Sequence, residues 1–203
     1  MHENILSEEQ KALLPFVQSF RKEFYLVGGT AIALQIGHRV SIDFDLFKSG
    51  SIQPAKISKR FEEFDLPFQL LFQDANGMHL LSNGVKITFY QFPFKVEARL
   101  VFESIKMPDL LHLAAMKAYA LGRRAKWKDY VDLYFVLKNH HPLPEVSAKA
   151  KSLFGELFSP KLFVQQLCYF GDVNYTEEIE YVDKEVPDAQ IREFLEGVAT
   201  GSF

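Results

Sequence analysis

The chain has 203 residues, 48% of them hydrophobic and 20 of them phenylalanine, so it can bury a sizeable core. Its net charge of −3 is not the basic excess of a general nucleic-acid-binding protein, and its single cysteine excludes a disulfide framework and a cysteine-ligated zinc site. The N-terminus lacks the pattern of a signal peptide, and no apolar run approaches the roughly 20 residues that span a bilayer. We therefore expect a cytoplasmic protein with no membrane segment.

Helices and short strands are predicted to alternate over the first part of the chain. Ser7 and Gln10 stand at the capping-box spacing, which predicts a helix that begins after Ser7. Residues 24–27 are short and apolar, as in a buried strand, and they run into two glycines. Thr30 is expected to cap a helix over residues 31–36.

Residues 40–47 alternate between apolar and polar side chains, which predicts a strand. Its two faces carry Ile42, Phe44 and Leu46 on one side, and Ser41, Asp43 and Asp45 on the other. Periodicity and turn signals then predict a helix over 54–64 and strands over 68–73, 79–81, 85–92 and 95–105, with turns at Asn76-Gly77 and Asn83-Gly84.

The pattern changes to helices at Pro108-Asp109. The predicted helices span residues 110–124, 126–141, 147–157, 160–169 and 188–198. We therefore expect two parts, an α/β core over residues 1–106 and a helical domain over residues 107–203.

Asp43 and Asp45 are the first candidates for chemistry. On a strand, residues two apart share a face at roughly 6.5–7 Å, so the two carboxylates can hold a divalent cation of the kind used in phosphoryl transfer. The alternative is a solvated strand face that happens to carry two acids. Aspartate is a poor strand former, and two on one face repel each other unless a cation compensates.

Gly28 and Gly29 strengthen the metal hypothesis. Glycines between a strand and a helix let the backbone approach a phosphate, and the helix N-terminus offers N–H groups to an anion. The Thr30 hydroxyl adds a further donor. The alternative is a tight turn that merely needs a positive φ. The chain has neither GxxxxGK[ST] nor GxGxxG, which disfavours a P-loop and a dinucleotide site.

Three cationic residues need anionic partners. Arg39 either binds phosphate or pairs with an aspartate. Lys117 and Arg124 lie on the apolar stripe of a predicted helix, so each binds a triphosphate, pairs with the protein's own carboxylates or extends its charged end to the surface. Asp129 and Asp132 are the nearest candidate carboxylates, and we favour a structural ion pair for them.

Four blocks together resemble those of the AbiEii/AbiGii toxin family of bacterial nucleotidyltransferases, which share the superfold of DNA polymerase β-type enzymes. The blocks are Gly28-Gly29-Thr30, residues 39–45 (RVSIDFD), Lys117 with Arg124, and residues 128–133 (KDYVDL). They follow the family order and cover residues 25 to about 137. The resemblance implies an α+β fold: a nucleotidyltransferase-like mixed sheet with helices, followed by a helical domain that packs against the active site.

The resemblance also implies roles for individual residues. Asp43, Asp45 and Lys117 are the expected catalytic residues, and the two aspartates would hold Mg²⁺ or Mn²⁺. The expected nucleotide-binding residues are Gly28, Gly29, Thr30, Arg39, Ser41 and Arg124.

The family's third acid is missing from this sequence. It should fall on a strand such as residues 85–92, which contain no Asp or Glu, and Thr88 occupies the position. Either another base such as Glu97 or Glu103 replaces it, or the activity is weakened or lost.

The resemblance implies an enzyme that transfers a nucleoside monophosphate from a nucleoside triphosphate to an acceptor hydroxyl. The implied acceptor is an RNA or tRNA end, and the implied partner of such a toxin is a cognate antitoxin. Two alternatives stay open. One is a small-molecule nucleotidyltransferase similar to the aminoglycoside and lincosamide enzymes, which the net charge of −3 favours. The other is a nucleotide-binding module that has lost catalysis with its third acid.

Overall fold

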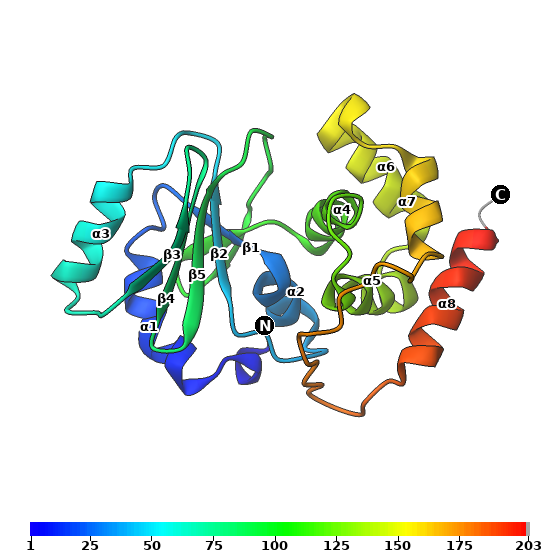
Figure 1. Ribbon diagram of the computed structural model, residues 1–203, viewed down its shortest axis with the longest axis horizontal. Coiled ribbons are helices and arrows are strands. Elements are labelled where there is room, and N and C mark those ends of the chain that lie inside the picture. The colour runs from blue at the N-terminus through cyan, green and yellow to red at the C-terminus, as the bar shows by residue number, and fades with distance from the viewer. Residues whose placement is uncertain (202–203) are drawn as a thin grey trace. The chain divides into compact units, whose positions relative to one another are not determined.

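The computed structural model describes residues 1–201 and divides the chain into two compact units, Met1–Asp109 and Leu110–Phe203 (Figure 1). The first unit contains η1 (Glu3–Ile5), α1 (Glu8–Gln18), β1 (Tyr25–Val27), α2 (Gly28–Ile36), β2 (Phe44–Lys48), α3 (Pro54–Glu63), β3 (Gln69–Gln73), β4 (Gly77–Ser82), β5 (Val85–Gln91), β6 (Leu100–Phe102) and β7 (Ile105–Met107). The second unit contains α4 (Leu110–Leu121), α5 (Trp127–Asn139), α6 (Leu143–Phe154), η2 (Gly155–Leu157), α7 (Pro160–Leu167) and α8 (Asp188–Thr200). No helix within residues 1–201 is long and apolar enough to cross a bilayer.

The strands of the first unit form one mixed sheet in the order β3-β4-β5-β2-β1-β7-β6. β2 runs antiparallel to β1 and parallel to β5, so the strand that carries Asp45 lies in the middle of the sheet. A mixed sheet with helices, followed by a helical unit, confirms the predicted α+β class.

Alternation along β2 and β5 gives the sheet two different faces. Leu46 and its cross-strand partner Phe89 are fully buried, and the ring centroids of Phe89 and Phe20 lie 4.8 Å apart. The adjacent partners Asp45 and Thr88 point to the opposite face. Figure 1 shows α1 and α3 on one side of the sheet and α2 on the other. The apolar face is therefore part of the core, and the face of Asp45 carries polar groups beside α2.

Local sequence signals explain how several elements begin and end. The Ser7 hydroxyl accepts from the Gln10 backbone at 3.2 Å, and the Gln10 side chain accepts from the Ser7 backbone at 3.1 Å, which confirms the capping box. Asn83 and Gly84 have φ of 49° and 78°, as a two-residue hairpin turn of type I′ requires. This turn fixes the register between β4 and β5.

Three of the predicted elements that differ from the structure have a clear local cause. β2 begins only at Phe44, because side chains rather than a strand ladder hold residues 41–43, and Ile42 is consequently exposed. Residues 95–105 form one short strand and a turn, not a continuous strand, because Glu103 and Ser104 adopt positive φ. The helix expected over 147–157 begins at Leu143, directly after Pro142.

The boundary between the units also differs in detail from the sequence-based one. A division between residues 106 and 107 would cut β7, which pairs with β6 and, through Lys106, with Tyr25 of β1. The first unit therefore extends to Asp109. The expected packing of the helical domain against the active site stays a prediction.

Candidate active site

Asp45 and Gly28 are brought together by the pairing of β1 with β2. Asp45 is the register partner of Val27, so its side chain emerges beside the residue that follows β1. Gly28 has φ of 76°, and a Cβ placed on it would lie 2.1 Å from Asp45 Oδ2. Only a residue without a side chain allows this carboxylate to lie against the turn. The glycine turn and one carboxylate therefore form a single local site.

Gly29 lies against Arg39 and Ser41, the first residues of the segment that leads to the two aspartates. A Cβ on Gly29 would lie 2.5 Å from Arg39 Nη2 and 2.9 Å from Ser41 Oγ. Arg39 is only 4% exposed, and its Nη1 donates to the Val40 carbonyl at 2.9 Å. The turn therefore has a carboxylate beside one glycine and a buried guanidinium beside the other, groups that could bind a metal ion and a phosphate respectively.

Thr30 does not cap the helix, which corrects the prediction made for it. α2 begins at Gly28, so Thr30 lies inside its first turn, and no side chain caps this N-terminus within the described chain. The Thr30 hydroxyl is buried, contacts the Asp43 carbonyl and lies 3.2 Å from the Ser41 carbonyl. Gln10 Nε2 donates to the same Ser41 carbonyl at 2.8 Å.

These contacts give Thr30 a different task from the one expected. The Thr30 hydroxyl can donate to the Asp43 carbonyl, the Ser41 carbonyl or the Ser41 hydroxyl, so it helps to fix residues 41–43. It thereby sets the position of Asp43 just ahead of β2. The first backbone N–H groups of α2 remain the natural donors for an anion at this helix end.

A row of side chains continues from Asp45 across the sheet. Thr88 is the register partner of Asp45 on β5 and occupies the place expected for the third acid. His79 on β4 is in turn the partner of Thr88, and its Nδ1 lies 3.2 Å from Thr88 Oγ1. Burial, followed by the charge of Lys86, lowers the pKa of His79, although the charges of Asp45 and Asp74 partly oppose this.

His79 was not identified as a site residue from the sequence, although a signal for it exists. The two-residue turn at Asn83-Gly84 pairs Ser82 with Val85, and counting back along both strands sets His79 opposite Thr88. The two alternative bases lie elsewhere. Glu97 is exposed between β5 and β6 and pairs with Arg99, and Glu103 lies in the turn before β7, so neither is on a strand next to β2.

The two aspartates are the groups that could hold a metal ion. Asp43 and Asp45 are both half-buried and offer carboxylate oxygens, the ligands that Mg²⁺ and Mn²⁺ prefer. Within residues 1–201 no group of three or more His, Cys, Asp or Glu side chains is placed to bind a metal. The donor set therefore fits an ion that takes its remaining ligands from substrate phosphates and water, as Mg²⁺ usually does.

In the second unit, Lys117 and two aspartates form a buried ion cluster. Lys117 Nζ lies 2.5 Å from Asp129 Oδ1 and 2.9 Å from Asp132 Oδ2, and both aspartate side chains have no exposed surface. Arg124, half exposed, donates to Asp129 through Nε at 3.0 Å. The structural ion pair predicted for Asp129 and Asp132 is confirmed. Lys117 does not extend its charged end to the surface, and its ammonium is held inside the unit.

This cluster predicts acid sensitivity of the helical unit. Burial on its own raises the pKa of Asp129, but the charges of Lys117 and Arg124 outweigh it and hold the pKa below its usual 3.8. A carboxyl group whose pKa is lowered by folding stabilises the fold at pH values above its pKa in the unfolded state. That stabilisation is lost as the pH falls below 3.8 towards the pKa of the folded state.

We expect fluorescence of Trp127, the only tryptophan and a buried residue of α5, to report this loss during acid titration. Asp129→Asn should flatten the pH dependence in this window. A titration curve that is the same for both proteins would contradict the assignment.

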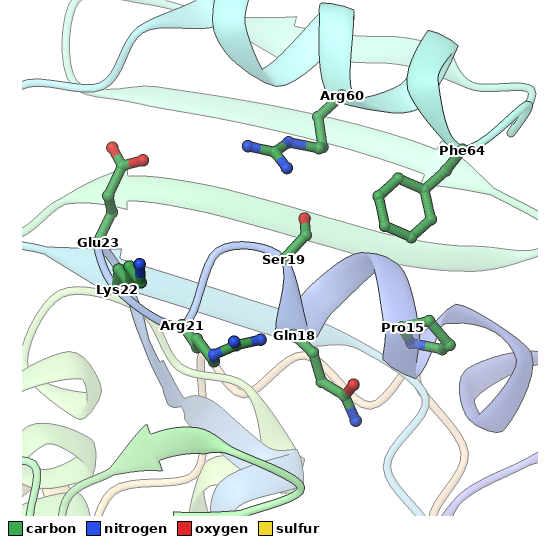
Figure 2. Close-up of a pocket in the computed structure, with 8 residues that line it drawn as sticks. All are labelled: Pro15, Gln18, Ser19, Arg21, Lys22, Glu23, Arg60 and Phe64. Carbon is green, nitrogen blue, oxygen red and sulfur yellow. The ribbon is translucent and has the colours of Figure 1, made fainter.

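A surface hollow of about 470 Å³ lies at the end of α1, beside α3 (Figure 2). Its lining residues are Pro15, Gln18, Ser19, Arg21, Lys22, Glu23, Arg60 and Phe64. It is on the side of the sheet that carries α1 and α3, whereas Asp45 points to the side of α2, and none of the predicted site residues lines it. The hollow is therefore separate from the predicted nucleotide-binding residues.

Comparison with known proteins agrees with this geometry. Residues 15–65, which include both glycines and both aspartates, match the family described as "Nucleotidyl transferase AbiEii toxin, Type IV TA system". The uncharacterized protein aq_aa25 of Aquifex aeolicus is 30% identical over 215 residues, covering 94% of this chain and 98% of that protein. The chain belongs to the AbiEii nucleotidyltransferase toxin family. It is accordingly a nucleotidyltransferase.

Solved structures show the same fold as this AbiEii family member. MenT4, nucleotidyltransferase toxin Rv2826c of Mycobacterium tuberculosis H37Rv, superposes with a TM-score of 0.65 at 14% identity, covering 93% of this chain and 80% of that one. A putative nucleotidyltransferase from H. pylori gives a TM-score of 0.58 at 15% identity, covering 96% of this chain and 94% of that one.

Gly28 provides a test of the site geometry. Gly28→Ala should strain the backbone at φ 76° by about 1–2 kcal/mol and push the Asp45 carboxylate away from the turn, because the new Cβ would lie 2.1 Å from Oδ2. We expect nucleotidyl transfer to be lost. Gly84→Ala is the matched control, since φ is 78° there but nothing lies within 4 Å of the added Cβ. It should lower the melting temperature and keep the activity; loss of activity in both variants would mean that strain alone is responsible.

Proposed function

We propose that this protein uses Asp43, Asp45 and the Gly28-Gly29 turn to transfer a nucleoside monophosphate from a nucleoside triphosphate to an RNA hydroxyl. The observation that carries the proposal is the contact of the Asp45 carboxylate with the Gly28 backbone. This contact supports the proposal, because a carboxylate that could bind a metal ion lies beside a helix N-terminus that could bind phosphate. Membership of the toxin family supports a role as the toxin of a toxin–antitoxin pair, with a cognate antitoxin as partner.

Each residue has a definite role in this proposal. Asp43 and Asp45 hold a divalent cation, Mg²⁺ or Mn²⁺, which when bound would neutralise phosphate charge. The Gly28 and Gly29 backbones and the N-terminus of α2 bind the β- and γ-phosphates, and the buried guanidinium of Arg39 adds positive charge. Ser41 lies against Gly29 and contributes its hydroxyl to the same place.

The reaction requires an acceptor oxygen in line with the phosphorus of the α-phosphate. The acceptor oxygen forms a bond to that phosphorus, the bond to the bridging oxygen breaks, and pyrophosphate leaves with the electron pair. The acceptor proton must pass to a base. Thr88 stands where the third acid would be and cannot serve as this base. His79, the next residue in the row that starts at Asp45, has an imidazole that can accept a proton and is the candidate base.

The second unit has a supporting role in the proposal. Lys117 holds α4 to α5 through Asp129 and Asp132. Arg124 uses two of its N–H groups on Asp129 while half of its side chain stays exposed. Phosphate binding by Lys117 and Arg124 stays a prediction.

Two labels on one nucleotide test the function. Wild-type protein is incubated with Mg²⁺, total RNA and a nucleoside triphosphate labelled at either the α- or the γ-phosphate. We expect α-label in RNA and γ-label in pyrophosphate. Transfer of γ-label would indicate a kinase instead. An aminoglycoside as acceptor tests the small-molecule alternative that the acidic net charge favours, and a nucleotide-dependent rise in melting temperature without transfer would indicate a module that only binds.

A further inference from the structure

One row of cross-strand partners runs from the active site to the edge of the sheet. Asp45 pairs with Thr88, Thr88 with His79, and His79 with Phe72. Register partners share a face of a sheet, so all four side chains lie on the face of the Asp45 carboxylate. At about 4.8 Å between strands, Phe72 is on the order of 14 Å from Asp45.

The outer end of this row is aromatic and open to solvent. Phe72 is 54% exposed, and its ring centroid lies 5.7 Å from that of His79 at an angle of 47°. β3, which carries Phe72, is an edge strand whose five residues are all exposed. Leu70 and Leu71 of the same strand are exposed as well, and a contiguous exposed apolar surface of this kind marks a binding site.

We propose that His79 and Phe72 form a stacking platform for a terminal base of a single-stranded RNA acceptor. This inference rests on the proposed function and adds the place where the acceptor binds. A base on the platform would lie next to Thr88, so the hydroxyl of its own or the adjoining nucleotide faces the α-phosphate site at Asp45.

The charges around the platform suit a nucleic acid strand. Lys86 lies on the same face, since its register partner Leu81 is two residues from His79. Its ammonium can pair with a backbone phosphate next to the stacked base. Burial and the charge of Lys86 lower the pKa of His79, which favours the neutral ring that stacks as an aromatic group. Asp74, in the turn between β3 and β4, accepts from the Asn76 and Gly77 backbones and so faces its own turn.

Aromatic side chains on a sheet are a common way to bind unpaired RNA bases. Such stacking tolerates different bases, because each base offers a π-face. The competing occupant of the same surface is a second copy of this chain that pairs along the β3 edge. RNA is favoured because the row leads directly to the carboxylate of the active site.

The test measures binding of a fluorescent single-stranded RNA oligonucleotide by anisotropy, with no nucleoside triphosphate present. Phe72→Ala should weaken binding about 5- to 100-fold, and Phe72→Tyr should keep it. Leu70→Ala is the matched control, because Leu70 is a 48%-exposed residue of the same strand that pairs with Leu80 on the opposite face. An oligonucleotide with an abasic end should bind wild type and Phe72→Ala equally.

Each possible result of these binding measurements either supports or overturns the stacking platform. Equal affinity of wild type and Phe72→Ala, or no RNA binding by wild type, would overturn the platform. A dimer in light scattering that Phe72→Ala dissociates would assign the surface to a second copy and also overturn it. RNA that binds in a Phe72-dependent manner but receives no α-label would keep the platform and reject the proposed reaction.

Discussion

Asp45→Asn and Asp43→Asn are each expected to lower nucleotidyl transfer by about 10²- to 10⁴-fold, since a catalytic cation contributes several kcal/mol to the transition state. Asparagine has nearly the same shape but removes the negative charge that the cation needs. Both aspartates are half-buried, so the melting temperature should stay close to that of wild type. The measurement is the initial rate of α-label transfer at saturating nucleotide.

Glu103→Gln is the control for these variants. It removes a carboxylate from the far part of the sheet, in the turn between β6 and β7, and should leave the rate unchanged. A loss of activity in Glu103→Gln would restore this residue as a candidate base. Full activity in both aspartate variants would refute the catalytic assignment.

Lys117→Met should produce the largest loss of stability. It leaves Asp129 and Asp132 without exposed surface and without the ammonium that both contact. Removing one partner from a buried ion pair typically costs about 3–5 kcal/mol. Urea unfolding followed by Trp127 fluorescence reports on this unit, because this single tryptophan is buried in α5.

Two further variants separate charge from packing. Arg124→Met removes a half-exposed partner of Asp129 and should cost no more than about 1 kcal/mol. Replacing Lys117 by Met together with Asp129→Asn and Asp132→Asn neutralises the whole cluster and should recover much of the lost free energy. A loss below about 1 kcal/mol in Lys117→Met alone would show that the cluster is not a stability determinant.

The fold could be predicted from the sequence wherever one local signal decides the structure. The capping box at Ser7 and the hairpin turn at Asn83-Gly84 are such cases, because neighbouring residues fix the geometry. The turn at Glu103 and Ser104 was harder to predict, since a positive φ at non-glycine residues has no strong signal in the sequence. The strand predicted over residues 95–105 is therefore interrupted by a turn at these two residues.

The residues of the candidate site could be predicted from the sequence, but the contacts that each of them makes could not. Alternation around β2 indicated a shared face for the aspartates, but not that Gln10 from α1 would hold the Ser41 carbonyl. Thr30 was expected to cap α2, yet it lies inside the first turn and its hydroxyl binds backbone 13 residues away. Long-range contacts of this kind depend on tertiary packing, which no local pattern encodes.

Binding of Mn²⁺, followed by electron paramagnetic resonance in the presence of a non-hydrolysable nucleoside triphosphate, tests the site at Gly28, Asp43 and Asp45 most directly. We expect wild type to bind Mn²⁺ only together with the nucleotide, and Asp45→Asn and Gly28→Ala to lose this binding. Glu103→Gln should bind as wild type does. Undiminished Mn²⁺ binding by Asp45→Asn would contradict the account.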